Sequence, residues 1–274
     1  MKRLLMSLGL LTILVGVCAK AQDSTKSTSA LSMMEPALVP AYEVATIKPS
    51  KPDEQGRGLN FRGRHLVVTN MTVEDLITLA YNIHPKQLTG GPGWLTVEHY
   101  DMDILTDHDD MPNLAWARGV ARKLLADRFA LKSHEETKEL SAYVLTVSRT
   151  GPKLTKSASD PGSPPGLGGP PGMCMVRNGS MAEFTQILQG TLDRPVLDQT
   201  GLKDRYDFTL RWAPDESQYG GRFLTQNNAD NGTNTDPLPS LFTAMQEQIG
   251  LRLDAMKALV KMFVVDSIDR PSAN

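Results

Sequence analysis

The chain has little cysteine and few aromatic residues. Two of its 274 residues are cysteines, and only 6% of the residues are Phe, Tyr or Trp. Cys18 lies in a segment with the features of an export signal, so Cys174 is expected to be the single cysteine of the mature chain. One cysteine excludes an intrachain disulfide. The mature fold must therefore depend on its hydrophobic core for stability, unlike many small exported domains.

Long hydrophobic runs and basic blocks are also missing beyond the N-terminal region. No segment after Val17 approaches the ~20 consecutive apolar residues that cross a bilayer, so we expect no membrane span in the mature chain. Removing residues 1–21 also removes Lys2, Arg3 and Lys20, which moves the formal net charge from −2 to −5. A mildly acidic chain without a basic stripe excludes nucleic acid as the expected partner.

The N-terminus has the pattern of a signal peptide. A short basic start and an apolar run to Val17 precede Ala19-Lys20-Ala21, which has the small residues that signal peptidases require. We therefore expect residues 1–21 to be removed, the mature chain to begin at Gln22, and the protein to be periplasmic or extracellular. Lipidation of Cys18 is the alternative, but Val17 is a branched residue where a small one normally precedes a lipidated cysteine. The sequence favours cleavage over lipidation.

Composition divides the rest of the chain into two units. Residues 22–40 are rich in Ser and Thr and indicate a flexible tether, and residues 150–178 contain a Pro/Gly-rich linker that excludes a helix and a central strand. The expected folded units are residues 41–149 and 179–274. The second unit contains a polar, Asn-rich segment, residues 213–237, that indicates a long loop.

Each unit contains a capped amphipathic helix. Residues 41–48 and 64–70 show the alternation of strands, and a helix is expected after Thr72, because an acid three positions later completes a capping box. Ser180 has the same arrangement in the second unit. Both caps precede apolar residues at helical spacing: Val73, Leu76, Ile77 and Ala80 in the first unit, and Phe184, Ile187 and Leu188 in the second.

A Thr-Gly turn followed by a Tyr-Asp strand occurs in both units. Thr89-Gly90 precedes Tyr100-Asp101, and Thr200-Gly201 precedes Tyr206-Asp207. Alternation along each strand predicts that the tyrosine is buried, and that the aspartate lies beside the Gly turn, where it accepts hydrogen bonds from backbone N–H groups. We interpret these eight residues as a structural motif and assign no catalytic residue. A shared catalytic carboxylate is the alternative.

The ends of the two units also correspond. Residues 121–147 and 241–268 align without gaps at an offset of 120, with apolar residues on apolar residues, and each indicates a helix, a short strand, a turn and a second strand. The pattern predicts an internal duplication in which each copy is helix, strand, helix and hairpin. The expected fold is α+β, with helices on one face of a mostly antiparallel sheet.

Two groups of residues could hold a metal. His99, Asp101 and Asp103 would project from one face of a strand and could bind a divalent cation. The corresponding face of the second unit has Arg205, Asp207, Thr209 and Arg211, so the scaffold does not require ligands there, and we predict neither a metal nor a cofactor. Cys174 lies between two methionines, which could bind Cu(I) as soft ligands, but a buried hydrophobic plug is the preferred interpretation.

Five segments in order give the chain a family resemblance: "YEVATIKPSKP", "MTVEDLITLAYNI…QLTGGPGWL…YDMDI", "LLADRFALKSHEETKELSAYVLTVSRTGPKL", "RPVLDQTGLKDRYDFTLRW" and "LFTAMQEQIGLRLDAMKALVKMFVVDSIDRPSAN". From Tyr42 onward the chain resembles the Soli-type family of exported acidobacterial proteins of unknown function. A similar module is found behind BlaR-type membrane sensor peptidases, which implies a sensing or binding role. A weaker similarity, to the βαβ modules of secretins and TonB-dependent receptors, also implies binding of other proteins. The family has no established catalytic residues to carry over.

These observations predict an exported, non-enzymatic binding or sensing module. Its partner would be an envelope protein or a cell-wall-derived ligand, and the sequence does not specify an oligomeric state. A secreted hydrolase that uses carboxylates such as Asp101, Asp103 and Asp207 is one alternative. A self-associating structural envelope protein is another.

Overall fold

A computed structural model describes residues 42–51, 56–106, 114–221 and 238–272. The predicted signal peptide and tether, and most of the predicted 213–237 loop, lie outside these ranges. In the described part of the chain, no helix is long and apolar enough to cross a membrane. The fold is α+β with mostly antiparallel strands, as the sequence predicts, but the strands form three sheets instead of one.

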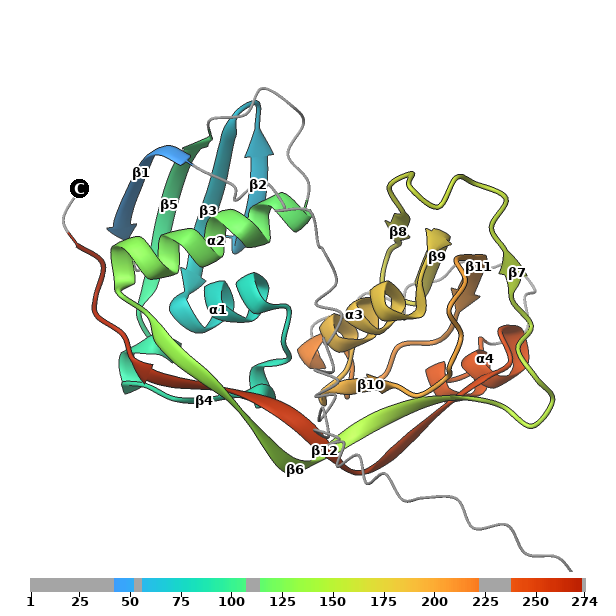
Figure 1. Ribbon diagram of the computed structural model, residues 1–274. Coiled ribbons are helices and arrows are strands. Elements are labelled where there is room, and N and C mark those ends of the chain that lie inside the picture. The colour runs from blue at the N-terminus through green and yellow to red at the C-terminus, as the bar shows by residue number, and fades with distance from the viewer. Residues whose placement is uncertain (1–41, 52–55, 107–113, 222–237, 273–274) are drawn as a thin grey trace, which may run out of the picture. The chain divides into compact units, whose positions relative to one another are not determined.

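The first sheet has the order β1-β5-β3-β2 and is antiparallel throughout. Two helices pack against it, and α2 crosses one of its faces (Figure 1). The resulting core contains the four apolar positions predicted for the first helix, all of them buried. The elements are β1 (Tyr42–Pro49), β2 (Gly58–Arg62), β3 (His65–Thr72), α1 (Val73–Tyr81), β5 (His99–Thr106) and α2 (Leu114–Phe129).

A second sheet, of order β7-β11-β9-β8, forms another core with two further helices. Its elements are β7 (Thr155–Lys156), β8 (Gly166–Gly168), β9 (Met173–Gly179), α3 (Met181–Thr191), β11 (Tyr206–Arg211) and α4 (Leu241–Gln248). Residues 150–178 were expected to contain no central strand, yet they supply β7, β8 and most of β9, which lies between two other strands. No proline lies in these three strands, Gly166 and Gly168 belong to the short edge strand β8, and β9 begins at Met173, directly after Gly172.

Two long strands replace the predicted hairpins. β6 (Lys132–Val147) and β12 (Leu251–Ser267) are each continuous, and they pair with each other antiparallel over nearly their whole length. Figure 1 shows this ribbon with β6 and β12 side by side. The hairpin prediction was wrong because a charged segment between two apolar ones resembles a turn. Here the charged segment is the exposed middle of a strand, and the backbone groups on one of its edges pair with β12.

The ribbon is extended by one short strand on each side. β10 (Val196–Asp198) pairs parallel with β6, and β4 (Leu88–Gly90) pairs parallel with β12. Glu139 lies opposite Leu259, and these two residues are related by the predicted offset of 120. The parallel pairs Val196–Tyr143 and Leu88–Phe263 follow the same offset on the long strands. An internal duplication would explain why positions of β6 and β12 that are 120 residues apart make equivalent pairs. The duplication stays a prediction.

The predicted helix caps are confirmed. The Thr72 hydroxyl accepts a hydrogen bond from the Asp75 N–H at 3.1 Å, and the Asp75 carboxylate accepts one from the Thr72 N–H at 2.8 Å. Ser180 and Glu183 form the same reciprocal pair at 3.2 and 2.8 Å. Each cap satisfies backbone donors that the first helical turn leaves unpaired, and so fixes where α1 and α3 begin.

Candidate functional site

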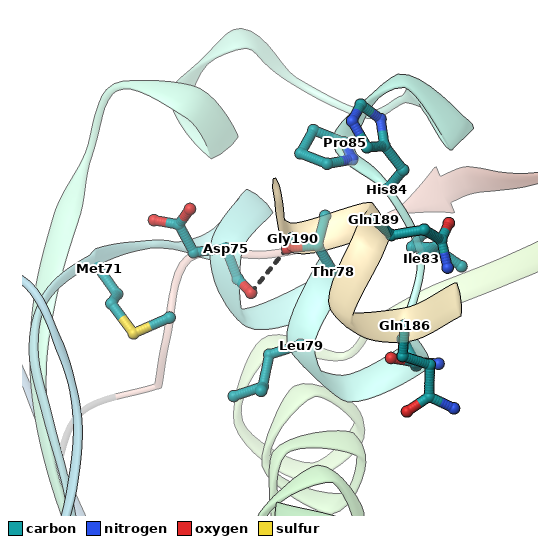
Figure 2. Close-up of a pocket in the computed structure, with 11 residues that line it drawn as sticks. Met71, Asp75, Thr78, Leu79, Ile83, His84, Pro85, Gln186, Gln189 and Gly190 are labelled. Atoms are coloured by element: carbon teal, nitrogen blue, oxygen red, sulfur yellow. Dashed lines mark hydrogen bonds between the residues drawn. The ribbon is translucent and has the colours of Figure 1, made fainter. Parts of the chain in front are cut away.

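A pocket of about 290 Å³ lies between α1, the segment that follows it, and α3 (Figure 2). Its volume is at the low end of cavities that bind small molecules. The lining combines apolar side chains, uncharged polar side chains and one carboxylate, from parts of the chain that are more than 100 residues apart. The lining residues are Met71, Asp75, Thr78, Leu79, Asn82, Ile83, His84, Pro85, Gln186, Gln189 and Gly190.

Arg118 of α2 fixes two amides of the pocket wall. Its guanidinium donates to the Asn82 side-chain oxygen at 2.7 Å and to the Gln186 side-chain oxygen at 3.1 Å. Because both oxygens accept from the arginine, both NH₂ groups are left to donate elsewhere. Neither donates to any other residue in the described part of the chain. The arginine therefore orients two hydrogen-bond donors at the pocket wall.

His84 is a structural residue of this pocket. Its side chain is buried, Nδ1 accepts a hydrogen bond from the Lys86 N–H at 3.1 Å, and Nε2 lies 3.3 Å from the Leu192 carbonyl oxygen. These contacts require the neutral tautomer with a proton on Nε2. Burial lowers the pKa of His84 below its usual value. With both ring nitrogens occupied, His84 is not placed to act as a general base.

Asp75 is the carboxylate of the pocket, and it is already engaged. It completes the α1 capping box and forms an ion pair with Arg57, and its own carbonyl oxygen accepts from the Thr78 hydroxyl at 2.9 Å. Burial alone would raise the pKa of Asp75, but the hydrogen bonds from Arg57 and Thr72 hold it below its usual value. The carboxylate therefore stays ionised, with its charge compensated by Arg57.

Gly190 leaves one wall of the pocket open. It lies inside α3, where glycine is less favourable than alanine by roughly 0.5–1 kcal/mol. A Cβ atom built on Gly190 would have no neighbour within 4 Å, so packing does not require the glycine. Gln189, beside it, forms no hydrogen bond with any other described residue. At this part of α3 the pocket therefore has open space beside Gly190, and the Gln189 amide is available to bind a ligand.

Comparison with known proteins gives a family match. A family described as "Protein of unknown function (DUF3738)" matches residues 74–268. The chain belongs to the DUF3738 family. No curated protein and no solved structure matches the chain. The more specific resemblance to the Soli-type family stays a prediction.

The DUF3738 match covers most of the candidate site. All lining residues except Met71 fall inside it, as do α1 after Val73, α3 and the whole β6–β12 ribbon. The match begins in α1, so β1, β2 and β3 precede it, although they complete the first sheet.

None of the eight residues of the predicted structural motif lines this pocket of the DUF3738 chain. Tyr100 and Tyr206 are buried, as alternation predicts. The Thr-Gly pairs are not equivalent in position: Thr89 and Gly90 belong to β4, whereas Thr200 and Gly201 follow β10. Because β4 pairs with β12 as β10 pairs with β6, β4 corresponds to β10 (Val196–Asp198). Thr200 and Gly201 lie after β10 and are therefore not equivalent to Thr89 and Gly90.

The motif aspartates accept hydrogen bonds from other backbone N–H groups than those of the predicted Gly turns. The Asp101 carboxylate accepts a hydrogen bond from the Asn70 N–H at 3.0 Å, and the Asp207 carboxylate accepts one from the Asn178 N–H at 2.6 Å. Both asparagines have left-handed backbones, with φ near 50°, two residues before a helix cap. Each aspartate thus stabilises the left-handed asparagine in the neighbouring strand, and does not bond to the Gly turn that precedes it in the sequence.

The candidate metal ligands do not converge. His99 contacts the Val97 carbonyl oxygen, Asp101 contacts Asn70 and Ser50, and Asp103 contacts His65 at 2.7 Å. Among described residues there is no group of three or more His, Cys, Asp or Glu side chains that could hold a metal ion. Residues 107–110, three aspartates and one histidine, lie outside the described ranges.

Cys174 lies in β9 with its side chain in the second core. Burial raises the pKa of its thiol to about 11. Since neighbouring side chains of a strand point to opposite faces, Met173 and Met175 face away from Cys174, and Met175 is exposed. The three sulfur atoms therefore do not form a common soft-metal site.

Sequence reasoning did not select the pocket residues. Asn82 is the C-cap of α1, and Gln186 and Gln189 are ordinary polar positions of α3. One available signal was Gly190, because a glycine inside a helix without a packing requirement indicates open space beside it.

Proposed function

We propose that this DUF3738 protein is an exported, non-enzymatic binding module that holds a small, uncharged, amide-bearing ligand in the pocket between α1 and α3. The observation that carries the proposal is the clamp of Arg118 on Asn82 and Gln186, which leaves two oriented NH₂ donors at the pocket wall. Amide donors of this kind complement acetamido, peptide and hydroxyl oxygens. A cell-wall fragment with N-acetyl groups has this chemistry.

The charges of the pocket support a neutral ligand. The carboxylate of Asp75 is compensated by Arg57, and His84 is held neutral by burial. A charged ligand would find no uncompensated partner among the pocket residues. Leu79, Ile83 and Met71 supply apolar contacts, as in most small-molecule sites.

The same contacts favour binding over catalysis. A hydrolase needs a nucleophile or a general base whose reactive atom is free to reach the substrate. Both nitrogens of His84 and the carboxylate of Asp75 are occupied by the protein itself.

Binding can be tested with N-acetylglucosamine, with glucose as the matched ligand that lacks the acetamido group. We expect chemical-shift changes at the residues of α1 and α3 with N-acetylglucosamine and weaker ones with glucose. Gln189→Ala should weaken binding. The matched control is Gln246→Ala, the same substitution in helix α4 outside the pocket, which should leave binding unchanged.

Gly190→Ala gives the sharper test. The methyl group enters the open side of the pocket, so binding should weaken, while the better helix propensity should raise the melting temperature. A more stable protein with weaker binding cannot be explained by damage to the fold. Equal binding of both sugars, or unchanged binding in Gly190→Ala, would reject the proposal.

Export is tested separately, by mass spectrometry of the protein from its native host. The expected mature N-terminus is Gln22. A diacylated Cys18 would show that the protein is a lipoprotein instead.

A further inference from the structure

One edge of the β6–β12 ribbon pairs with no described strand over half its length. β10 pairs with β6 only from Tyr143 to Leu145, while β12 covers the other edge of β6. Upstream of Tyr143, the side of β6 away from β12 pairs with no described strand. This segment, residues 133–141, is called the β6 edge below.

The hydrogen bonds at Tyr143 show which backbone groups point outward along the β6 edge. The Tyr143 N–H donates to the Pro195 carbonyl oxygen at 2.8 Å, and the Leu145 carbonyl oxygen accepts from the Gln199 N–H at 2.9 Å. The backbone N–H and C=O groups of the odd-numbered residues of β6 therefore point away from β12. Alternate residues of a strand share this direction. The residues of the β6 edge that direct both N–H and C=O outward are therefore Ser133, Glu135, Thr137, Glu139 and Ser141.

A basic cavity lies where β10 ends and the β6 edge begins. Its volume is about 510 Å³, and Lys86, Leu140, Ser141, Asp193 and Arg194 line it. Arg194 donates to the Ser141 hydroxyl at 3.0 Å and to Asp193 at 3.2 Å, and the Lys86 ammonium lies 3.6 Å from Asp193. Two cations therefore face one carboxylate. Among the residues that line the cavity, one positive charge is in excess.

We propose that the β6 edge binds an extended peptide in line with β10, with the C-terminal carboxylate of the peptide in the cavity between Lys86 and Arg194. Strand addition would satisfy the outward backbone groups of the edge. Because β10 and the cavity lie beyond Ser141, a peptide with its C-terminus there runs parallel to β6, as β10 does. The carboxylate would balance the excess positive charge.

Side chains of the edge select the residues upstream of that carboxylate. Glu135 and Glu139 are exposed and share the face of β6 on which Ser141 meets Arg194. Each already pairs with a β12 lysine, Glu135 with Lys261 at 3.1 Å and Glu139 with Lys257 at 3.5 Å, and a peptide lysine would share or replace these exposed ion pairs. Basic side chains at alternate peptide positions would lie opposite these glutamates, whereas acidic ones would be repelled. The partner is thus a peptide tail with alternating basic residues and a free C-terminus.

The probe is the synthetic peptide acetyl-Lys-Val-Lys-Val-Lys-Val-Val, compared with the same peptide carrying a C-terminal amide. With its last residue opposite Ser141, its first and fifth residues lie opposite Glu135 and Glu139. Titration with the full mature chain should show that amidation weakens binding about tenfold, the usual effect of losing a hydrogen bond between charged groups. Lys86→Met should weaken binding of the free acid and reduce the difference between the two peptides. Lys86 is exposed, so this variant is expected to fold normally.

A pair of proline variants tests strand addition itself. Thr137→Pro removes an outward N–H of β6 and should abolish binding, whereas Ala255→Pro removes an outward N–H from the other edge of the same ribbon and should leave binding intact. Both positions are exposed, and neither N–H pairs within the ribbon.

Three results would overturn the proposal: equal binding of the acid and the amide, equal losses in the two proline variants, or no binding to the wild-type chain. Dimerisation of the wild-type chain that Thr137→Pro abolishes would also overturn it, in favour of a second copy on this edge. The site is independent of the proposed sugar pocket, and Gly190→Ala should not change peptide binding. Failure of one proposal is therefore distinguishable from failure of the other.

Discussion

The backbone N–H of Asn178 donates to the Asp207 carboxylate at 2.6 Å, and Asn70 and Asp101 repeat this bond in the first sheet. In both places the aspartate holds a left-handed residue just before a helix cap. The bond connects the strand that carries the tyrosine to the start of the helix that packs on it. It gives the aspartate of each Tyr-Asp pair a structural role.

Removing one such bond should destabilise the fold moderately. Asp101→Ala removes the acceptor of both the Asn70 N–H and the Ser50 hydroxyl, so the free energy of unfolding should fall by about 1–2 kcal/mol. Asp103→Ala, on the same strand face but exposed, should change it by less than about 0.5 kcal/mol. Urea denaturation measures both. Equal losses would indicate that the contact with Asn70 has no special role.

Truncating the buried tyrosines should cost more. Tyr206→Ala and Tyr100→Ala should each lower the free energy of unfolding by about 3–5 kcal/mol, because each leaves a large cavity in a core. Leu259→Ala, at an exposed position of the ribbon, is the control and should be nearly neutral. A normally stable Tyr206→Ala protein would contradict the structural role of this residue.

Two histidines should affect the pH dependence of stability in opposite directions. Burial lowers the folded pKa of His84, so below pH ~6.5 the unfolded chain binds more protons at this site, and stability falls as the pH falls. Hydrogen bonds to Glu136 and Asp266 raise the pKa of His134, so its contribution is present at low pH and is lost as the pH rises through its folded pKa.

The test is the urea midpoint between pH 7 and pH 5. His84→Gln should flatten the decline toward low pH, since glutamine can retain both hydrogen bonds without titrating. His134→Gln should make the decline steeper. The same change in both variants would contradict the assignment.

Cys174 should react slowly in the folded protein. A chain that begins at Gln22 has Cys174 as its single cysteine. A pKa of about 11 lowers the thiolate fraction at pH 8 on the order of 100-fold relative to a free thiol, before steric protection is added. Reaction with Ellman's reagent in buffer and in 6 M urea compares the two states directly. Fast modification in buffer would show that β9 opens readily.

The alternating pattern of the ribbon predicts how proline is tolerated in β6. Lys138→Pro removes an N–H that points toward β12 and should lower the melting temperature clearly. Thr137→Pro, one residue earlier, removes an outward N–H and should change it little. Circular dichroism melting curves decide the order of the two variants, and the reverse order would mean that the register of the ribbon is different.

Local features were accessible from the sequence by itself. Thr72 and Ser180 specify their helix starts through contacts only three residues apart, and the alternation around Tyr100 and Tyr206 specifies which side chains are buried. Both signals depend on neighbours in the chain, so they survive without knowledge of the fold.

Only the tertiary structure decided what depends on distant pairing. β6 and β12 are continuous strands because each supplies the other's hydrogen bonds across roughly 120 residues, and no local pattern separates such a strand from a hairpin. The pocket is likewise lined by residues from two distant segments, and Arg118 connects Asn82, 36 residues before it, with Gln186, 68 residues after it. A binding site made of common polar residues has no sequence signature until folding brings those residues together.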